Sequence, residues 1–275
     1  MKRRILEGAI TATLAVSASG AWATCADVPR DLLEAAISYA ETFPGGHGNP
    51  TGGYGLPMWA TVVDETGAVC HVATSGDPGK FAGNTEWLGS RVISAQKANT
   101  ANAFSLDGYA ISTANLHNAT EETGSLFGLQ HSNPVDASQG YLGNPDKYGT
   151  HHDPLKGKRI GGINVFGGGL ALYKNGKKIG ALGVSGDTSC RDHAYAWRMR
   201  ENLQMHPVGI VGITTSNMNA AGDVQTPLKD PSLLRGDEMI ISGGGSNYWE
   251  AWSQPACPNS KPASLIPANG TLQIP

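Results

Sequence analysis

Residues 161–203, GGINVFGGGLALYKNGKKIGALGVSGDTSCRDHAYAWRMRENL, hold the pattern that decides the fold. Two apolar runs, Ile163–Tyr173 and Ile179–Val184, flank the dipeptide Asn175-Gly176. Asn-Gly between apolar runs favours the mirror-image hairpin turn, because both central positions of that turn need a positive φ. The stretch therefore predicts a pair of antiparallel strands.

A helix is predicted directly after this hairpin. Ser189 and Asp192 have the spacing of a capping pair, and one helical face carries the apolar residues Ala196, Met199 and Leu203. The loop before the helix contains Ser185, Gly186 and Asp187, whose backbone N–H groups would suit an anionic ligand. The alternative is a hairpin packed on a helix with nothing bound, since such units mostly serve folding.

The same order of elements occurs earlier in the chain. A helix is predicted for Asp27–Phe43, with Asp27 as its cap, and a second hairpin for Met58–Val63 and Ala68–Thr74. The next predicted helix is Glu86–Leu106. It has a narrow stripe of small residues, so its backbone could lie close to a sheet: Leu88, Val92, Ala95, Ala98 and Ala101.

The N-terminus has the features of an export signal. A basic start, an apolar run and the sequence Ala21-Trp22-Ala23 predict a cleaved signal peptide over residues 1–23, hence a periplasmic or secreted protein. Four cysteines in an exported chain favour disulfides. We expect Cys25 and Cys257 to join the two ends, leaving Cys70 and Cys190 to pair or to act as thiols.

Composition limits the classes of partner. The formal net charge of −3 argues against nucleic acid, which needs a basic surface. No apolar run after the signal peptide is long enough to span a membrane. The 37 glycines predict many turns and close backbone approaches.

Two long segments flank the predicted hairpin unit. Residues 107–160 form a polar, Gly-rich insertion, and residues 204–275 a C-terminal extension that we expect to pack on the same domain of residues 24–203. A structureless loop of this length is uncommon inside a compact domain unless it is disordered or functional, for example as a lid. Within the insertion, His151 and His152 form a weak candidate metal site, which would need His131 or His117 as a further ligand.

Several short sequence motifs together resemble the HbpS/GlcG family, which is itself similar to the C-terminal domain of the cobalamin adenosyltransferase PduO. The resemblance covers roughly residues 31–203, apart from most of the insertion. It is carried by Val62-Val63-Asp64-x-x-Gly67, Lys97-Ala98-x-Thr100-Ala101, Gly161-Gly162 and Gly180-Ala181-Leu182-Gly183-Val184-Ser185-Gly186, with Asp192 and Ala196 following.

The resemblance implies a profilin-like α/β fold, in which helices pack against an antiparallel sheet, and assembly into a homo-oligomer. It also implies haem binding, with haem degradation or iron binding in some members. Iron needs an axial ligand such as His or Cys, so His193 is the first candidate, followed by Cys190 and His71. Lys97 and Thr100 are candidates for contacts with a haem propionate, together with the N–H groups of the Ser185–Asp187 loop.

Two other functions remain open from the sequence. The insertion and its histidines would also suit an enzyme that acts on a small organic acid or aromatic compound. A ligand-binding or sensory module without chemistry is the third possibility. No nucleophile-and-base motif, zinc-protease helix or phosphate-binding loop occurs in the chain.

Overall fold

A computed structural model describes residues 23–42, 53–76, 87, 89–214, 217–218, 224–225, 235–242 and 251–257 of the chain. The predicted signal peptide, residues 1–23, therefore lies almost wholly outside the described residues. No helix in the described part of the chain has both the length and the apolar character needed to cross a membrane.

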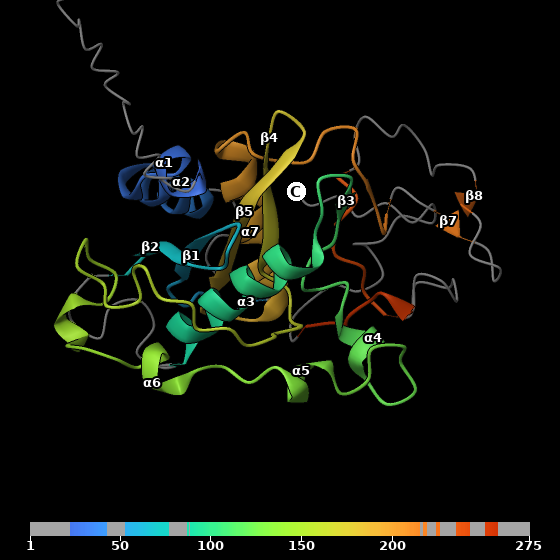
Figure 1. The fold of residues 1–275 in the computed structure, drawn as a ribbon, viewed down its shortest axis with the longest axis horizontal. Coiled ribbons are helices and arrows are strands. Elements are labelled where there is room, and N and C mark those ends of the chain that lie inside the picture. Colours follow the sequence, from blue (N-terminus) through green and yellow to red (C-terminus); the bar gives the residue numbers. More distant parts are fainter. Residues whose placement is uncertain are drawn as a thin grey trace, which may run out of the picture.

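The centre of the molecule is a four-stranded antiparallel sheet (Figure 1). Its order is β2-β1-β5-β4, so each hairpin contributes one central and one edge strand. This confirms the predicted mixed fold of helices packed against an antiparallel sheet. The strands are β1 (Trp59–Asp64), β2 (Val69–Thr74), β4 (Gly169–Lys174) and β5 (Lys177–Ser185).

Helices cover both faces of this sheet. Helix α3 (Ser90–Phe104) packs on one face, whereas α2 (Arg30–Glu41) and α7 (Ser189–Asn202) pack on the other. Alternate residues of β5 point to opposite faces. Ala181 therefore joins the apolar cluster under α3, and Leu182 joins the larger cluster under α2 and α7.

The small-residue stripe on α3 lets this helix lie directly on the strands, as predicted. A Cβ atom added at Gly183 of β5 would fall well inside contact distance of the Ser94 carbonyl oxygen and the Ala98 backbone nitrogen. A Cβ atom at Gly169 of β4 would meet the backbone of Lys97 in the same way. The glycines of the strands and the alanines of α3 thus permit contact between backbones.

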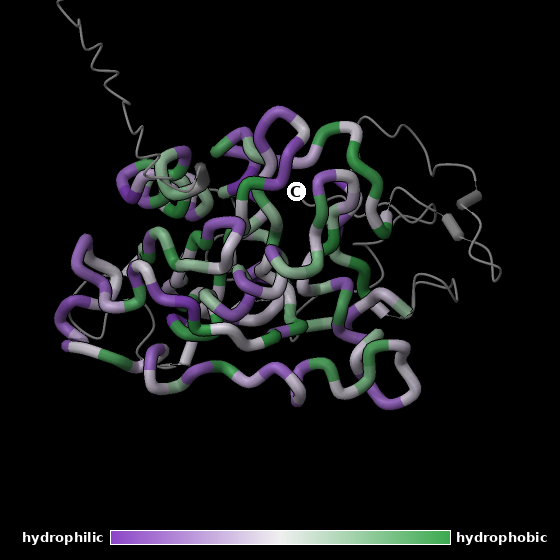
Figure 2. The backbone as a smooth tube through the Cα atoms, viewed as in Figure 1, coloured by the Kyte–Doolittle hydropathy of each residue, from purple (hydrophilic) through white to green (hydrophobic). Residues whose placement is uncertain are grey.

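The turn of the second hairpin is also as predicted. Asn175 and Gly176 have φ values of 52° and 74°, the left-handed conformation that the mirror-image turn requires. The tip is exposed and hydrophilic (Figure 2). The strand before it begins at Gly169 rather than at Ile163. Residues 163–168 instead form a loop, in which the Asn164 N–H donates to Thr100 Oγ1 over 2.9 Å.

The N-terminal caps of two helices differ from the predicted ones. The cap of α7 is Thr188, whose hydroxyl accepts a hydrogen bond from the Arg191 N–H, and Ser189 is the first helical residue. Helix α2 has Pro29 at its N-cap and no side-chain cap, because Asp27 belongs to a separate short helix, α1 (Ala23–Asp27).

The expected disulfide pairing is wrong. Cys25 of α1 bonds Cys70 of β2, and Cys190 of α7 bonds Cys257 near the C-terminus. No cysteine of the chain is free. Each disulfide therefore fixes one outlying segment to the central unit, instead of joining the two ends to each other.

The segment between α3 and β4 is not a simple loop. It runs along the lower edge of the molecule, past α3 (Figure 1), and contains five short elements separated by turns and loops. Arg91 of α3 holds it by donating to the Gly140 carbonyl and pairing with Asp153. The elements are β3 (Tyr109–Ala110), α4 (His117–Thr120), α5 (Leu129–Ser132), α6 (Ala137–Gly140) and the 3-10 helix η1 (Pro145–Lys147).

Described parts of the C-terminal extension contact both this segment and α7. Strand β6 (Val211–Gly212) pairs in parallel with β3. Arg200 of α7 forms a buried ion pair with Asp237, with Nη1 and Oδ2 2.5 Å apart. Strands β7 (Asn217–Met218) and β8 (Val224–Gln225) pair with each other.

Candidate functional site

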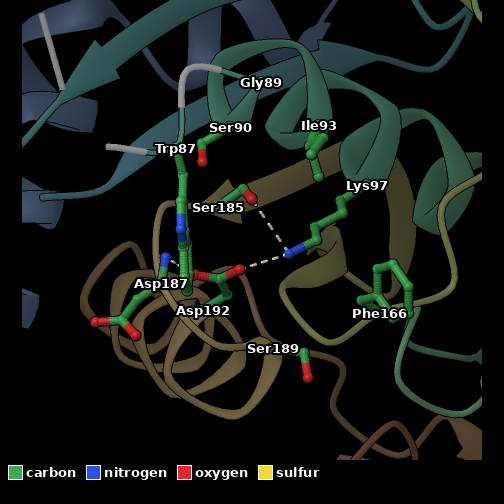
Figure 3. Close-up of a pocket in the computed structure, with 10 residues that line it drawn as sticks. All are labelled: Trp87, Gly89, Ser90, Ile93, Lys97, Phe166, Ser185, Asp187, Ser189 and Asp192. Atoms are coloured by element: carbon green, nitrogen blue, oxygen red, sulfur yellow. Dashed lines mark hydrogen bonds and ion pairs between the residues drawn. The ribbon is translucent and has the colours of Figure 1, made fainter. Parts of the chain in front are cut away.

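A cleft opens where the start of α3, the end of β5 and the start of α7 meet. Its inner cavity has a volume of about 330 Å³, in the range of small-molecule sites. Trp87 and Phe166 stand on opposite sides of the Lys97 ammonium group (Figure 3), and the side chain of Ile93 lies near them. We call this inner cavity, together with the adjoining outer one described below, the α3–α7 cleft.

A buried ion pair forms the floor of the inner cavity. Lys97 Nζ lies 2.7 Å from Asp192 Oδ2 and donates to the Val184 carbonyl over 3.2 Å, with Ser185 Oγ 3.5 Å away. Burial raises the pKa of Asp192 to about 6, although the Lys97 charge opposes this shift. Burial likewise lowers the pKa of Lys97, while Asp192 acts to raise it. Burial thus favours the neutral form of both side chains, and each remains charged only because the other is charged.

Asp187 holds the other side of the cleft together. Its carboxylate accepts hydrogen bonds from the backbone N–H groups of Tyr54, Gly55 and Leu56, at 2.8–3.0 Å. Its own N–H donates to Asp192 Oδ1 over 2.9 Å, and its carboxylate points away from Lys97 in Figure 3. Asp187 therefore fixes residues 54–56 against α7 instead of offering its carboxylate to a ligand.

The outer cavity adjoins the first and has a volume of about 400 Å³. It shares Trp87, Phe166 and Ser189 with the inner cavity. The C-terminal segment closes one side, where Gln254 donates to Ser189 Oγ over 3.1 Å and accepts from the Gly167 N–H over 3.1 Å. It is also lined by Tyr54, His117, Thr188, Pro255, Ala256 and Cys257.

The predicted anion-contacting residues come together only in part. Lys97, Ser185 and Asp187 line the inner cavity. Thr100 lies a turn further along α3, where its hydroxyl donates to the Gln96 carbonyl and accepts from residue 164. Gly186 packs against the backbone of Met58, so that a Cβ atom there would collide with it. These last two residues are structural.

His193 is not placed to bind a ligand in the cleft, contrary to the sequence prediction. Its side chain is fully buried behind Gly167 and Gly168, and Nδ1 accepts from the Gly168 N–H over 3.4 Å. Nε2 has no hydrogen-bond partner among the described residues. Burial lowers the pKa of His193 to about 3, and the positive charges of Arg200 and Lys97 add to this effect.

The other two candidate iron ligands also lie outside the described lining of the cleft. Cys190 is bonded to Cys257, so it has no thiolate to offer. His71 is half-buried in β2, opposite Val62 of β1, and burial lowers its pKa. The strand places His71 beside the N-terminal segment, where it hydrogen-bonds the backbone of Cys25.

The histidines of the 107–160 segment do not assemble into the predicted metal site. His151 is exposed, with Nε2 3.9 Å from Asp31 Oδ1, and His152 is exposed next to it. His131 lies in α5, a separate element. Within the described ranges, no three His, Cys, Asp or Glu side chains are close enough together to hold a metal ion.

The sequence prediction missed Trp87 and Phe166, among other lining residues of the cleft, and considered His117 only as a ligand of a separate metal site. Phe166 lies in the glycine-rich run before β4. The sequence predicts a strand there, and nothing in a strand pattern marks this side chain as part of a cleft. His117 belongs to a segment whose path the sequence does not reveal. Neither periodicity nor spacing brings these positions together.

Comparison with known proteins assigns the family. The sequence model of the family described as haem degrading protein HbpS-like matches residues 49–200, more than half of the chain. The chain therefore belongs to the HbpS-like family. No curated protein matches the chain.

Two similar solved structures have the same low identity to this chain, 22%, and a TM-score of 0.42. One is the crystal structure of Klebsiella pneumoniae protein ORFY, of family-model DUF336. The match covers 66% of this chain and 89% of the ORFY chain. The other is the crystal structure of a PduOC:heme complex, for which the match covers 66% of this chain and 94% of the PduOC chain.

Proposed function

We propose that this chain is an exported haem-binding protein that holds the porphyrin in the α3–α7 cleft. The single observation that carries the proposal is the pair of aromatic side chains, Trp87 and Phe166, on either side of a buried ammonium group. Membership of a family described as haem-degrading supports the same ligand.

The residues of the cleft fit haem in three respects. Trp87 and Phe166 are 41% and 48% exposed, so a flat apolar ring would remove substantial aromatic surface from water. Lys97 supplies a cation for a propionate, in competition with Asp192. His117 supplies an imidazole in the outer cavity. The cleft is also open on one side, which suits a ligand larger than either cavity.

When bound, haem supplies an iron atom and a flat ring whose oxidation opens the macrocycle. The chain would capture the ligand outside the cytoplasm, buffer its concentration or degrade it slowly. The predicted signal peptide and the two disulfides support this location, because disulfides persist in oxidising compartments. We also propose that the protein forms a homo-oligomer, on the family resemblance alone.

Haemin titration followed by absorbance tests the proposal. We expect a saturable shift of the Soret band with one haemin per chain. Phe166→Ala should weaken binding about tenfold, because a half-covered phenyl ring contributes about 1–1.5 kcal/mol. Phe127→Ala is the matched control, since Phe127 is 65% exposed and lies in the 107–160 segment, away from the described lining of the cleft.

Equal affinities of the two variants and the wild type would exclude this cleft as the haem site. Absence of any saturable shift in the wild type would reject haem binding altogether. Incubation of the loaded protein with ascorbate as electron donor and dioxygen as oxidant then separates the roles: a stable Soret band indicates buffering, and its decay with release of iron indicates degradation.

A further inference from the structure

His117 differs from the other described histidines in its position. It is the first residue of α4, and its side chain is only 14% exposed. The preceding residue, Leu116, is buried in an apolar cluster and so anchors the start of the helix. The imidazole lies beside Phe166, with ring centroids 5.8 Å apart, and lines the outer cavity of the α3–α7 cleft. In the described part of the chain, it is the one histidine at this cleft.

Hydrogen bonds around His117 define which ring nitrogen carries the proton. Nδ1 lies 3.1 Å from Asn118 Oδ1. The amide nitrogen of Asn118 donates to Ser242 Oγ over 3.1 Å and to Ser253 Oγ over 2.9 Å. This arrangement turns the amide oxygen towards His117. Because that oxygen can only accept, the proton must be on Nδ1 in the neutral ring.

The other ring nitrogen, Nε2, is then left with its lone pair. Glu121 Oε1 lies 4.0 Å from it, beyond hydrogen-bonding distance, and that glutamate is 56% exposed. A histidine that binds a metal commonly donates its second N–H to an oxygen acceptor, which fixes the tautomer and the orientation of the ring. His117 and Asn118 have this arrangement.

We propose that His117 Nε2 is the axial ligand of haem iron and that Asn118 is the residue that positions it. This inference rests on the proposed haem-binding function. Of the other side-chain types that ligate haem iron, the described lining of the cleft contains Tyr54 and Cys257, and Cys257 is bonded to Cys190. A phenol must lose its proton before it binds iron, whereas the neutral imidazole of His117 already has a lone pair available.

Parallel titrations with haemin and with iron-free protoporphyrin IX test the ligand. His117→Ala should weaken haemin binding at least about tenfold, because loss of even a residue that only orients a metal ligand typically costs about 10–100-fold in affinity, and should change the ferric EPR spectrum. Binding of protoporphyrin IX should stay within about twofold of wild type, and added imidazole should restore the spectrum. His131→Ala is the matched control, because His131 is exposed in α5.

The two proposals fail in distinguishable ways. A wild type that binds neither porphyrin rejects the proposed function. A wild type that binds haemin, with an unchanged EPR spectrum and affinity in His117→Ala, keeps haem binding and overturns His117 as the ligand. His117 is likewise overturned if Tyr54→Phe, and not His117→Ala, changes the spectrum.

The reduction potential of the bound iron tests the role of Asn118. In Asn118→Asp, a carboxylate would accept the Nδ1 proton more strongly, make the imidazole a better donor and lower the potential. In Asn118→Leu, no acceptor remains, and the potential should rise. General loosening of α4 would move both variants the same way, so a common direction or no change would overturn the positioning role.

Discussion

The burial of His193 predicts an acid-induced loss of stability that one substitution removes. In the folded chain its pKa is about 3, against an ordinary value near 6.5. The neutral ring is therefore favoured by folding. This contribution is complete above pH 6.5 and is lost as the pH falls towards 3, because the unfolded chain binds the proton first. The difference between these two pKa values lowers the free energy of unfolding by about 2 kcal/mol between pH 7 and pH 5.

His193→Asn is the suitable change, because the Asn side chain can still accept from the Gly168 N–H but does not titrate. Urea unfolding of the wild type and the variant at pH 7 and pH 5 measures the effect. The variant should be less stable at pH 7, and the stability gap should shrink by about 2 kcal/mol at pH 5. Other titrating groups, such as Asp192, are common to both chains and cancel in this difference.

A gap that stays constant between the two pH values would refute the burial argument. His131→Asn, the same substitution at an exposed histidine of α5, provides the control for the substitution itself. The same variant tests the function of His193. Haemin affinity of His193→Asn at pH 7 should remain within about threefold of wild type, a difference of under 1 kcal/mol. Loss of binding would restore His193 as a ligand candidate.

Three further predictions concern contacts around the cleft. Gly183→Ala should lower the unfolding free energy by about 3 kcal/mol or more in urea titrations, because its Cβ would collide with the backbone of α3; a loss under about 1 kcal/mol would contradict the close packing. Lys97→Met should cost about 3–5 kcal/mol by leaving Asp192 buried without its partner, and adding Asp192→Asn, which removes the charge but keeps an oxygen to accept from the Asp187 N–H, should recover most of it. An equally unstable double variant would contradict that explanation. Replacing Cys190 and Cys257 by Ser should cost about 4 kcal/mol and weaken haemin binding, since the bond closes a 67-residue loop and holds one wall of the cleft. Unchanged haemin affinity would show that this wall is dispensable.

Local patterns in the sequence predicted the sheet well. Asn175-Gly176 specifies its turn through backbone conformation alone, and the alanine stripe of α3 specifies close packing through the size of its side chains. Both signals lie within a single element or turn. They depend on short-range physics that no distant part of the chain overrides.

The composition of the cleft depends on long-range contacts that such patterns do not carry. His193 lies near the start of α7, where the sequence led us to expect an iron ligand, but the Gly167–Gly168 backbone folds over it and buries it. His117 reaches the cleft because Asn118 anchors α4 to Ser253 of the C-terminal segment, 135 residues away. Four cysteines allow three pairings, and only the fold selects between them.

The position of iron in crystals of the haemin-loaded protein tests the central claim most directly. Anomalous scattering at the iron edge locates the metal without reference to the porphyrin density. We predict one peak per chain in the α3–α7 cleft, between Trp87 and Phe166 and within bonding distance of His117. A peak at the exposed pair His151 and His152, or at any site outside the cleft, would contradict this claim.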